Sequence, residues 1–339
     1  MRSMSLSKVN VGIIGCGWIS EVHLTSLSQL PEASVIAVSD IVEEKAKQTA
    51  IRFGIPRYYK DYVEMLEKED IDVVDVLVPT SLHAKVVIDC LEMGKHVIVE
   101  KPIAASVEEG ERIIEAVKRS GKKFTVAHNY RFWPKFAKAK EAIDKGKIGE
   151  VKYVMTNHRG WFWWKGAWIR WTLKKPSGGP IVEVGIHPID LVRWYLGKEI
   201  VRIYALAKHV HFGIEVPDLI YMTMEAEDGS LGSVEVCRTI IPRPYPYYHF
   251  LQIEGEKGSI QVYDCFDADF VTYNENGVSL REGQLIIPEH GYLQELRYFL
   301  RCVIEDKPPL VTAEDATRAL ELAWKAVESA EKGKPIDVR

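Results

Sequence analysis

The feature that most constrains the fold is a glycine turn between a short apolar run and an amphipathic stretch near the N-terminus. Residues 9–14 are apolar and end in a Gly-Cys-Gly turn, and residues 18–30 then show helical spacing. This order predicts a strand, a tight turn and a helix. Gly15 permits the turn and Gly17 lets the backbone approach a pyrophosphate. Ser20, at the third glycine position, is small enough for the helix to pack closely.

The start of this helix and the end of the next strand predict a dinucleotide site. At the helix start, the backbone N–H groups of Trp18 and Ile19 can bind phosphates. A second apolar run ends at Asp40, 23 residues after the second glycine, about where an acidic residue binds the adenosine ribose hydroxyls. A carboxylate there repels a 2′-phosphate, and Ile41 and Val42 supply no cation, so NAD is favoured over NADP. The alternative is that Asp40 merely caps the following helix.

Strand-like and helical stretches alternate through the rest of the first 127 residues. Further strands are expected at residues 72–78, 96–99 and 123–127, and helices at residues 43–53, 82–93 and 107–120. Such alternation predicts an α/β fold of the Rossmann type with a doubly wound parallel sheet. Ligands bind outside the carboxyl ends of the strands in such sheets. The residues that follow these strands are therefore site candidates: Thr80, Glu100, Lys101 and residues 128–131.

A chain of 339 residues suits two domains. We expect an NAD(P)-binding domain over residues 1–128 and an α+β domain for substrate binding and oligomerisation over residues 129–339, with a C-terminal helix at about 312–332 packing back on the first domain. Strand character recurs in the second domain at residues 151–157, 201–208, 219–225, 231–238, 249–254 and 259–263. Short connections between them predict a large, mostly antiparallel open sheet.

This open sheet also predicts self-association. In a monomer, part of its apolar surface would be exposed to solvent. The residues expected to form that surface include Val201, Ile203, Ile220, Met222 and Val234. A homodimer or homotetramer built through the sheet of the second domain is therefore expected.

Composition and charge exclude several other classes of protein. The formal net charge is −4, and the cations are spread along the chain, so nucleic acid is not an expected partner. A polar N-terminus and the lack of a long apolar run argue against a membrane. Five dispersed cysteines suggest a reducing, cytoplasmic location. No metal is expected, because the pair His209 and His211 has no evident third ligand.

Several separated motifs follow one another in a specific order. They are Pro79-Thr80-Ser81-Leu82-His83, Gly94-Lys95-His96-Val97, Glu100-Lys101-Pro102, and Gly178-Gly179 with Glu183, Gly185, His187 and Asp190. In this order they resemble the glucose-fructose oxidoreductase/inositol dehydrogenase (Gfo/Idh/MocA) family over nearly the whole chain. The resemblance implies the fold and the reaction class but not the substrate.

The resemblance also implies roles for individual residues. Dinucleotide contacts are implied for Pro79, Thr80, His83, Glu100 and Lys101. Lys101 is implied in catalysis or substrate binding as well, and Asn129 with Arg131 resembles a stretch that lines the substrate pocket. One departure is Glu183, because the family usually carries Asp four residues before the histidine.

Two groups can exchange a proton with an alcohol. Pro102 restricts the backbone of Lys101 to extended geometry and can form a cis peptide bond, so we expect the ammonium to have a defined direction. His187 precedes a helix expected at residues 188–196, where the helix dipole keeps an imidazole neutral and able to act as a general base. Glu183 is expected to orient it. The alternatives are a solvated surface lysine and a capping or core histidine.

Five of the nine tryptophans lie within residues 161–171. Aromatic faces suit sugar rings, and Trp168 is our candidate for substrate contact. The alternative is that these rings bury a loop against the sheet or a neighbouring subunit. For Arg131 the alternative is a structural ion pair.

The function predicted is NAD-dependent oxidation of a secondary alcohol of a sugar, inositol or sugar derivative, or reduction of the matching ketone. Lys101, His187 and Glu183 are the expected catalytic residues, acting in the gap between the two domains. One alternative enzyme keeps NAD bound and uses transient oxidation, to break a glycosidic bond or to pass hydride between sugars. A non-catalytic sugar- or NAD-sensing regulator is the other alternative.

Overall fold

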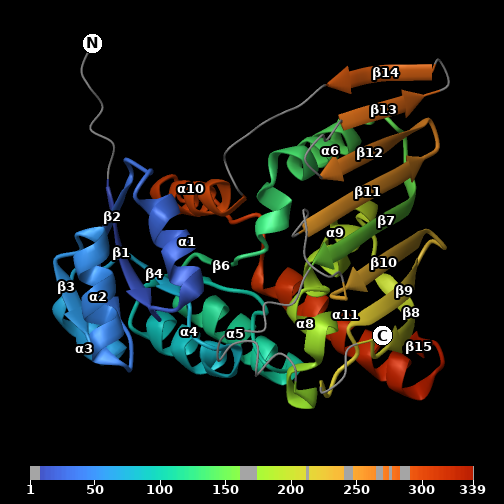
Figure 1. Cartoon of the computed structure of the whole chain (residues 1–339). Coiled ribbons are helices and arrows are strands. Elements are labelled where there is room, and N and C mark those ends of the chain that lie inside the picture. The colour runs from blue at the N-terminus through green and yellow to red at the C-terminus, as the bar shows by residue number, and fades with distance from the viewer. Residues whose placement is uncertain are drawn as a thin grey trace, which may run out of the picture. The chain divides into compact units, whose positions relative to one another are not determined.

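The structure is a computed structural model that describes residues 8–160, 174–210, 214–239, 247–264, 270–274, 277–282 and 291–338. The chain divides into two compact units (Figure 1). The first consists of residues 1–132 and 289–317, and the second of residues 133–288 and 318–339.

The first unit is built on a parallel sheet of six strands among the described residues, in the order β3-β2-β1-β4-β5-β6. The strands are β1 (Val9–Ile14), β2 (Ala33–Ser39), β3 (Arg57–Tyr59), β4 (Val73–Val76), β5 (His96–Val99) and β6 (Phe124–Val126). The strand order steps outward from β1 in both directions, as in a doubly wound sheet. The predicted Rossmann fold is confirmed.

Helices connect these strands. They are α1 (Trp18–Leu27), α2 (Glu43–Phe53), α3 (Tyr62–Lys68), the short 3₁₀ helix η1 (Thr80–Leu82), α4 (His83–Glu92), α5 (Val107–Ser120) and the 3₁₀ helix η2 (Asn129–Phe132). The sequence analysis did not predict β3 or α3. Both are short, and β3 is largely exposed, so neither carries a clear hydrophobic period.

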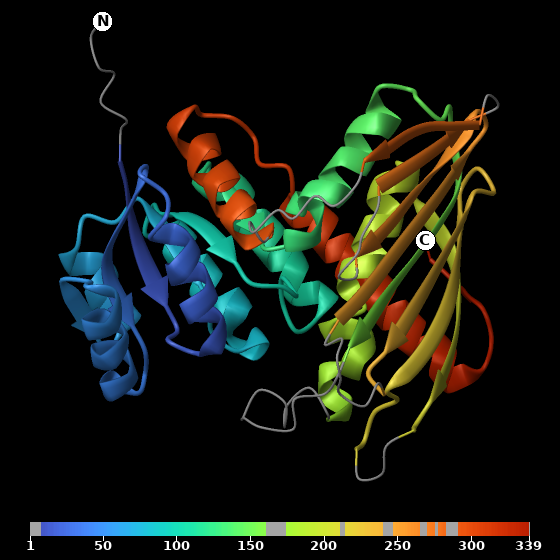
Figure 2. The ribbon, with the colours of Figure 1, turned by 45° about the horizontal axis from the view of Figure 1, so that its top comes forward.

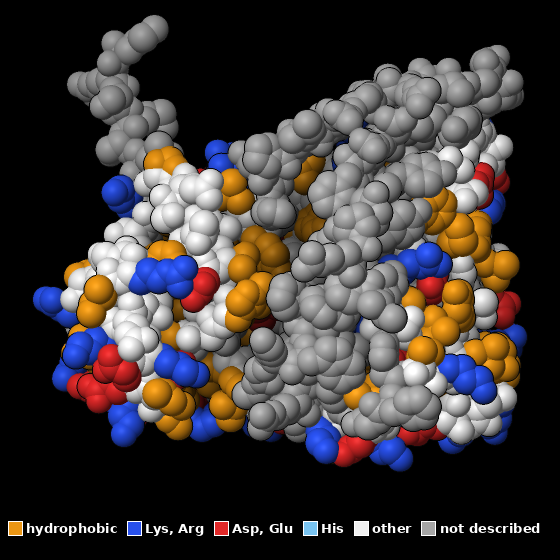
Figure 3. Space-filling view, in the orientation of Figure 1, with side chains coloured by type: hydrophobic (Ala, Val, Ile, Leu, Met, Phe, Trp, Pro, Cys, Tyr) orange, Lys and Arg blue, Asp and Glu red, His pale blue; other side chains and the backbone are white. Residues whose placement is uncertain are grey.

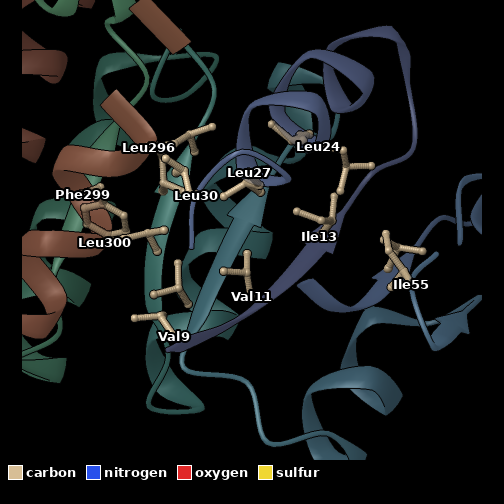
Figure 4. Close-up of a cluster of buried hydrophobic side chains, with 14 of the residues drawn as sticks. Val9, Val11, Ile13, Leu24, Leu27, Leu30, Ile55, Leu296, Phe299 and Leu300 are labelled. Atoms are coloured by element: carbon tan, nitrogen blue, oxygen red, sulfur yellow. The ribbon is translucent and has the colours of Figure 1, made fainter. Parts of the chain in front are cut away.

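The core of the first unit includes a helix from the C-terminal part of the chain. Helix α10 (Gly291–Ile304) packs on α1, and Figure 4 shows Leu296, Phe299 and Leu300 facing Leu27 and Leu30. Burial of each such side chain is worth about 1.5–3 kcal/mol. We had expected the helix at 312–332 to return to this unit. Instead α10 does so, together with the first residues of α11 (Ala313–Lys332), whose remainder belongs to the second unit.

The second unit contains a sheet whose described strands number nine, in the order β14-β13-β12-β11-β7-β10-β9-β8-β15. They are β7 (Val151–Gly160), β8 (Ile200–Lys208), β9 (Leu219–Ala226), β10 (Leu231–Cys237), β11 (Tyr247–Gly255), β12 (Gly258–Asp264), β13 (Phe270–Asn274), β14 (Gly277–Glu282) and β15 (Ile336–Asp337). Only β7 and β10 pair in parallel among these strands, so the mostly antiparallel sheet is confirmed.

Helices cover one face of this sheet. Helices α6 (Pro134–Asp144), α9 (Ile186–Leu196) and α11 lie on the same side in Figure 2, and Ala205 N–H donates to Ser329 Oγ on α11 at 2.9 Å. Most of the apolar residues that were expected to be exposed to solvent lie instead on this covered face. Ile203, Ile220, Met222 and Val234 are at most 2% exposed, whereas Val201 is 37% exposed. Strand alternation groups residues by face but does not say which face the helices cover.

We predict that Gly15→Ala destabilises the chain and that Gly17→Ala does not. Gly15 has φ +102°, and a Cβ there would lie 2.6 Å from the carbonyl oxygen of Leu77, so a loss of about 1–3 kcal/mol in the free energy of unfolding is expected. A Cβ on Gly17 meets no atom within 4 Å. Urea unfolding of both variants tests this, and equal losses would contradict it.

Candidate active site

The turn between β1 and α1 has the form that a dinucleotide pyrophosphate requires. Gly15 N–H donates to the carbonyl of Ser39 at 2.8 Å. Ser20 is buried, and its hydroxyl donates to the carbonyl of Gly17 at 2.6 Å. Gly17 is the N-cap of α1 with no side-chain cap, and Trp18 beside it is 76% exposed. The first N–H groups of α1 are therefore placed to bind an anion.

Asp40 connects the end of β2 to this turn. Its Oδ2 accepts from the N–H of Cys16 at 2.9 Å, and its Oδ1 accepts from the N–H of Val42 at 2.8 Å. Val42, not Asp40, is the N-cap of α2, so the helix-capping alternative is not the arrangement seen. A carboxylate offers about four acceptor positions, which leaves capacity for two ribose hydroxyls. Ile41 is 83% exposed and carries no charge, so the residues present fit NAD.

His83, an expected dinucleotide contact, is buried between two loops. It is 1% exposed at the start of α4, next to Thr80 in η1 and the exposed Pro79. Its Nδ1 lies 2.7 Å from the carbonyl oxygen of Pro102, and its Nε2 lies 2.9 Å from that of Val78. Burial lowers the pKa of this ring. A neutral ring donates to one of these two carbonyls, so His83 links the loop after β4 to the loop after β5, and its contact with the cofactor stays a prediction.

Glu100, a second expected dinucleotide contact, has partners inside the protein. The Glu-Lys-Pro motif follows β5, and the peptide bond between Lys101 and Pro102 is cis. Glu100 is 9% exposed, and its Oε2 accepts from the backbone N–H of Lys101 at 3.0 Å. Its Oε1 lies 3.3 Å from Nε2 of His23. The carboxylate thus faces the interior, and it anchors the peptide that carries Lys101.

The buried partners of Glu100 were not predicted from the sequence. His23 on α1 is fully buried, and its Nδ1 lies 2.8 Å from Oδ2 of Asp75 on β4. Burial opposes a charge on His23, but the carboxylates of Asp75 and Glu100 outweigh it and raise its pKa well above the usual value. Burial also acts against the charge of Glu100, yet His23 and Lys101 hold its pKa below the usual value. An aspartate inside an apolar strand was the available signal.

Residues after β6 lie in η2. Asn129 and Arg131 are 2% and 3% exposed. The guanidinium of Arg131 lies 3.5 Å from Oδ2 of Asp315 and donates to the carbonyl of Leu310 at 3.4 Å. This contact fits the alternative of a structural ion pair, and substrate binding by Asn129 and Arg131 stays a prediction.

In the second unit, Glu183 and His187 lie on consecutive short helices. Glu183 ends α8 (Gly179–Glu183), and His187 stands in the first turn of α9, which Gly185 begins and Gly197 ends in the left-handed conformation. Each is 7% exposed. The helix breaks between them, so their spacing of four does not put them on one helical face.

A second polar cluster was missed in the sheet of the second unit. His158, Arg238 and His249 are at most 5% exposed. The guanidinium of Arg238 lies 3.2 Å from Nε2 of His158, and the rings of His158 and His249 are 5.1 Å apart. Buried cations and imidazoles on adjacent strands are suited to recognise a polar ligand or to hold a structural network. Pairing of β7 with β10 and β11 brings them together, which one strand alone does not reveal.

Some expectations lie outside the described residues, namely Trp168 with the rest of residues 161–171, and His211. Within the part of the chain that is described, no group of three His, Cys, Asp or Glu side chains is arranged to hold a metal ion. The same part contains no helix with the length and apolar character needed to cross a membrane.

Comparisons with known proteins agree with this architecture. The family models described as the NAD-binding Rossmann fold and the C-terminal alpha/beta domain of the Gfo/Idh/MocA oxidoreductases match residues 9–128 and 140–338. The scyllo-inositol 2-dehydrogenase (NAD(+)) of Bacillus subtilis is 32% identical, over 98% of this chain and 96% of that protein. The myo-inositol 2-dehydrogenase of Thermotoga maritima is 28% identical, over 97% and 98%.

Solved structures share the fold as well. Levoglucosan dehydrogenase in complex with NADH has a TM-score of 0.88 at 24% identity, covering 98% of this chain and 99% of that one. The glycine turn, Asp40 and these matches define an NAD-dependent dehydrogenase that acts on CH–OH groups. The chain belongs to the Gfo/Idh/MocA oxidoreductase family.

We predict that Asp40→Ala weakens NAD⁺ binding by about tenfold to a hundredfold, because hydrogen bonds to a charged group are worth about 1.5–3 kcal/mol. NADP⁺ binding should fall less, since a repulsive carboxylate is also removed. Titration calorimetry with both dinucleotides measures this. Glu43→Ala, which removes an exposed carboxylate from the first turn of α2, is the control, and equal losses for NAD⁺ and NADP⁺ would contradict the assignment.

Proposed function

We propose that this enzyme oxidises a secondary alcohol of an inositol, a cyclic sugar or a sugar derivative with NAD⁺, or reduces the matching ketone. Three relatives that match it are named for such substrates: the inositol dehydrogenases of Bacillus subtilis and Thermotoga maritima, and a levoglucosan dehydrogenase from Pseudarthrobacter phenanthrenivorans at 28% identity. The observation that carries the proposal is a lysine held by its backbone at the carboxyl end of β5, in the unit that binds the dinucleotide.

Lys101, His187 and Glu183 are the proposed catalytic residues. NAD⁺, when bound, supplies the acceptor for the hydride that leaves the carbinol carbon. The hydroxyl proton must leave as well, and a neutral His187 in the first turn of α9 can accept it. The ammonium of Lys101 donates a hydrogen bond to the substrate oxygen. Glu183 orients the imidazole, with the longer side chain that distinguishes this sequence.

The state of the cysteines bears on where the enzyme works. The cysteines Cys16, Cys90, Cys237 and Cys302 are free and buried. Unpaired thiols are usual in reducing compartments, so we propose that the enzyme works in the cytoplasm.

We further propose that it forms a homodimer or homotetramer through the uncovered face of the second-unit sheet. Leu206, Tyr221 and Leu231 on β8, β9 and β10 are 57%, 52% and 50% exposed. Tyr221 is paired with Leu206 on one neighbouring strand and with Glu235 on the other. Arg159 donates two hydrogen bonds to Glu235, of 2.9 and 2.6 Å. Figure 3 shows hydrophobic side chains between charged ones over these strands. Such a surface suits a protein interface with a polar rim.

We predict that the wild type reduces NAD⁺ with at least one member of a panel of inositols, cyclic sugars and uronates, and that Lys101→Ala lowers kcat by about 10²- to 10⁴-fold. The absorbance of NADH measures both. Lys118→Ala, which removes an exposed cation on α5, should keep wild-type rates. Turnover without release of NADH would indicate an enzyme that retains its dinucleotide, and binding without turnover would indicate a sensor.

Tyr221→Glu should dissociate the oligomer, because it places a charge in an apolar contact. Light scattering at micromolar concentration should give a smaller mass for this variant than for the wild type. Ile51→Glu, at an exposed apolar position on α2, is the control and should leave the mass unchanged. A monomeric wild type would overturn the proposed assembly.

A further inference from the structure

Three carboxyl side chains of the first unit are buried around one imidazole. His23 from α1 and Asp75 from β4 are 0% exposed, Glu295 from α10 is 3% exposed, and Glu100 after β5 is 9% exposed. The ring of Tyr292, also on α10, lies 5.5 Å from that of His23. The proposed chemistry uses none of these side chains directly. Because burial of unneeded charge is costly, the cluster calls for a role.

The geometry determines the charge of His23. Each ring nitrogen faces a carboxylate oxygen, Nδ1 at 2.8 Å from Asp75 and Nε2 at 3.3 Å from Glu100. A carboxylate only accepts hydrogen bonds, so both nitrogens must carry protons and the ring is an imidazolium. One cation thus joins a carboxylate inside β4 to the carboxylate at the end of β5.

Glu295 differs from the other two acids. Burial raises its pKa well above the usual value, with Glu100 and Asp75 acting in the same direction and His23 against it. Among the described residues its Oε1 has no hydrogen-bond partner, and the same holds for Oδ1 of Asp75, whose other oxygen lies beside His23. Its surroundings therefore favour the neutral form of Glu295, whereas those of Glu100 favour the charged form. Lys101, bonded through its backbone N–H to Glu100, brings the remaining positive charge.

Buried groups hold the Lys101–Pro102 dipeptide at both ends. At one end Glu100 accepts from the N–H of Lys101 at 3.0 Å. At the other end the carbonyl of Pro102 lies 2.7 Å from the ring of His83. A lysine side chain is long and flexible, so a backbone fixed on both sides reduces the number of directions in which its ammonium can lie.

We propose that the Asp75–His23–Glu100 chain is a positioning device that fixes the backbone of Lys101 from inside the protein. Asp75 holds the imidazolium, the imidazolium holds the carboxylate of Glu100, and that carboxylate holds the N–H of Lys101. The inference rests on the proposed catalytic role of Lys101. His23 and Asp75 act through other residues and contact no substrate.

The positioning role is tested by replacing each of two buried glutamates, Glu100 and Glu295, by glutamine. Glu100→Gln removes a charge that holds Lys101, and kcat should fall by about tenfold or more, since small misplacements at a reacting centre are costly. The KM for NAD⁺ should change by less than about threefold, because the glycine turn is untouched. Glu295→Gln replaces a neutral acid by a neutral amide of the same shape, and both constants should stay within about twofold of wild type.

The protonation of His23 can be measured by NMR spectroscopy, independently of turnover. In ¹⁵N-histidine-labelled protein at pH 8, His23, assigned by its loss in His23→Gln, should show two protonated nitrogens. Asp75→Asn removes the larger attraction and should leave His23 neutral at that pH. Equal kinetic losses in Glu100→Gln and Glu295→Gln, or a neutral His23 in the wild type, would overturn the inference. A wild type that turns over no alcohol of the panel contradicts the proposed function alone, and the NMR measurement still decides the state of His23.

Discussion

The first unit depends on the close approach of Gly15 to the carbonyl of Leu77. There is no room for a side chain at that point, because a Cβ would lie 2.6 Å from the carbonyl oxygen. The backbone therefore turns sharply at the end of β1, beside β4, and α1 starts directly over the carboxyl ends of the strands. Two consequences follow from the position of α1. Its first N–H groups are open to a pyrophosphate, and its sixth residue, His23, reaches the interior between β4 and β5.

The chemistry of the first unit thus has an outer and an inner part. Outside, Gly17, Trp18 and Asp40 form a surface that fits NAD. Inside, buried histidines hold the loops that end β4 and β5. The reactive group that we propose, the ammonium of Lys101, lies at the junction of these parts, on a peptide anchored by Glu100. Hydride transfer depends more on accurate placement of the reacting groups than on strong acids or bases. The anchored peptide restricts the position of the Lys101 ammonium in this way.

Much of the fold could be predicted from the sequence. Local patterns predicted the bounds of β1, β5, α2 and α5 as the structure has them, because a glycine within two residues of one end of each element limits where it can begin or end. The short elements β3, α3, β13, β14 and β15 were missed, since they are defined by pairing or packing with distant residues.

The candidate site was harder to predict than the fold. Strand ends singled out Glu100 and Lys101 as site candidates, and the family resemblance added His83. However, the carboxylate of Glu100 and the ring of His83 point inward. His23, Asp75 and Glu295 come from three distant segments, and only the folded chain brings them together. The ion pair of Arg131 with Asp315, far along the sequence, likewise becomes visible only in the folded chain.

The central claim is that hydride passes from a carbinol carbon to NAD⁺. The most direct measurement follows deuterium from an inositol or sugar substrate labelled on its ring carbons. The account predicts deuterium at C4 of the reduced nicotinamide and slower turnover of the labelled substrate. Substrate consumed without deuterium in the nicotinamide would contradict it.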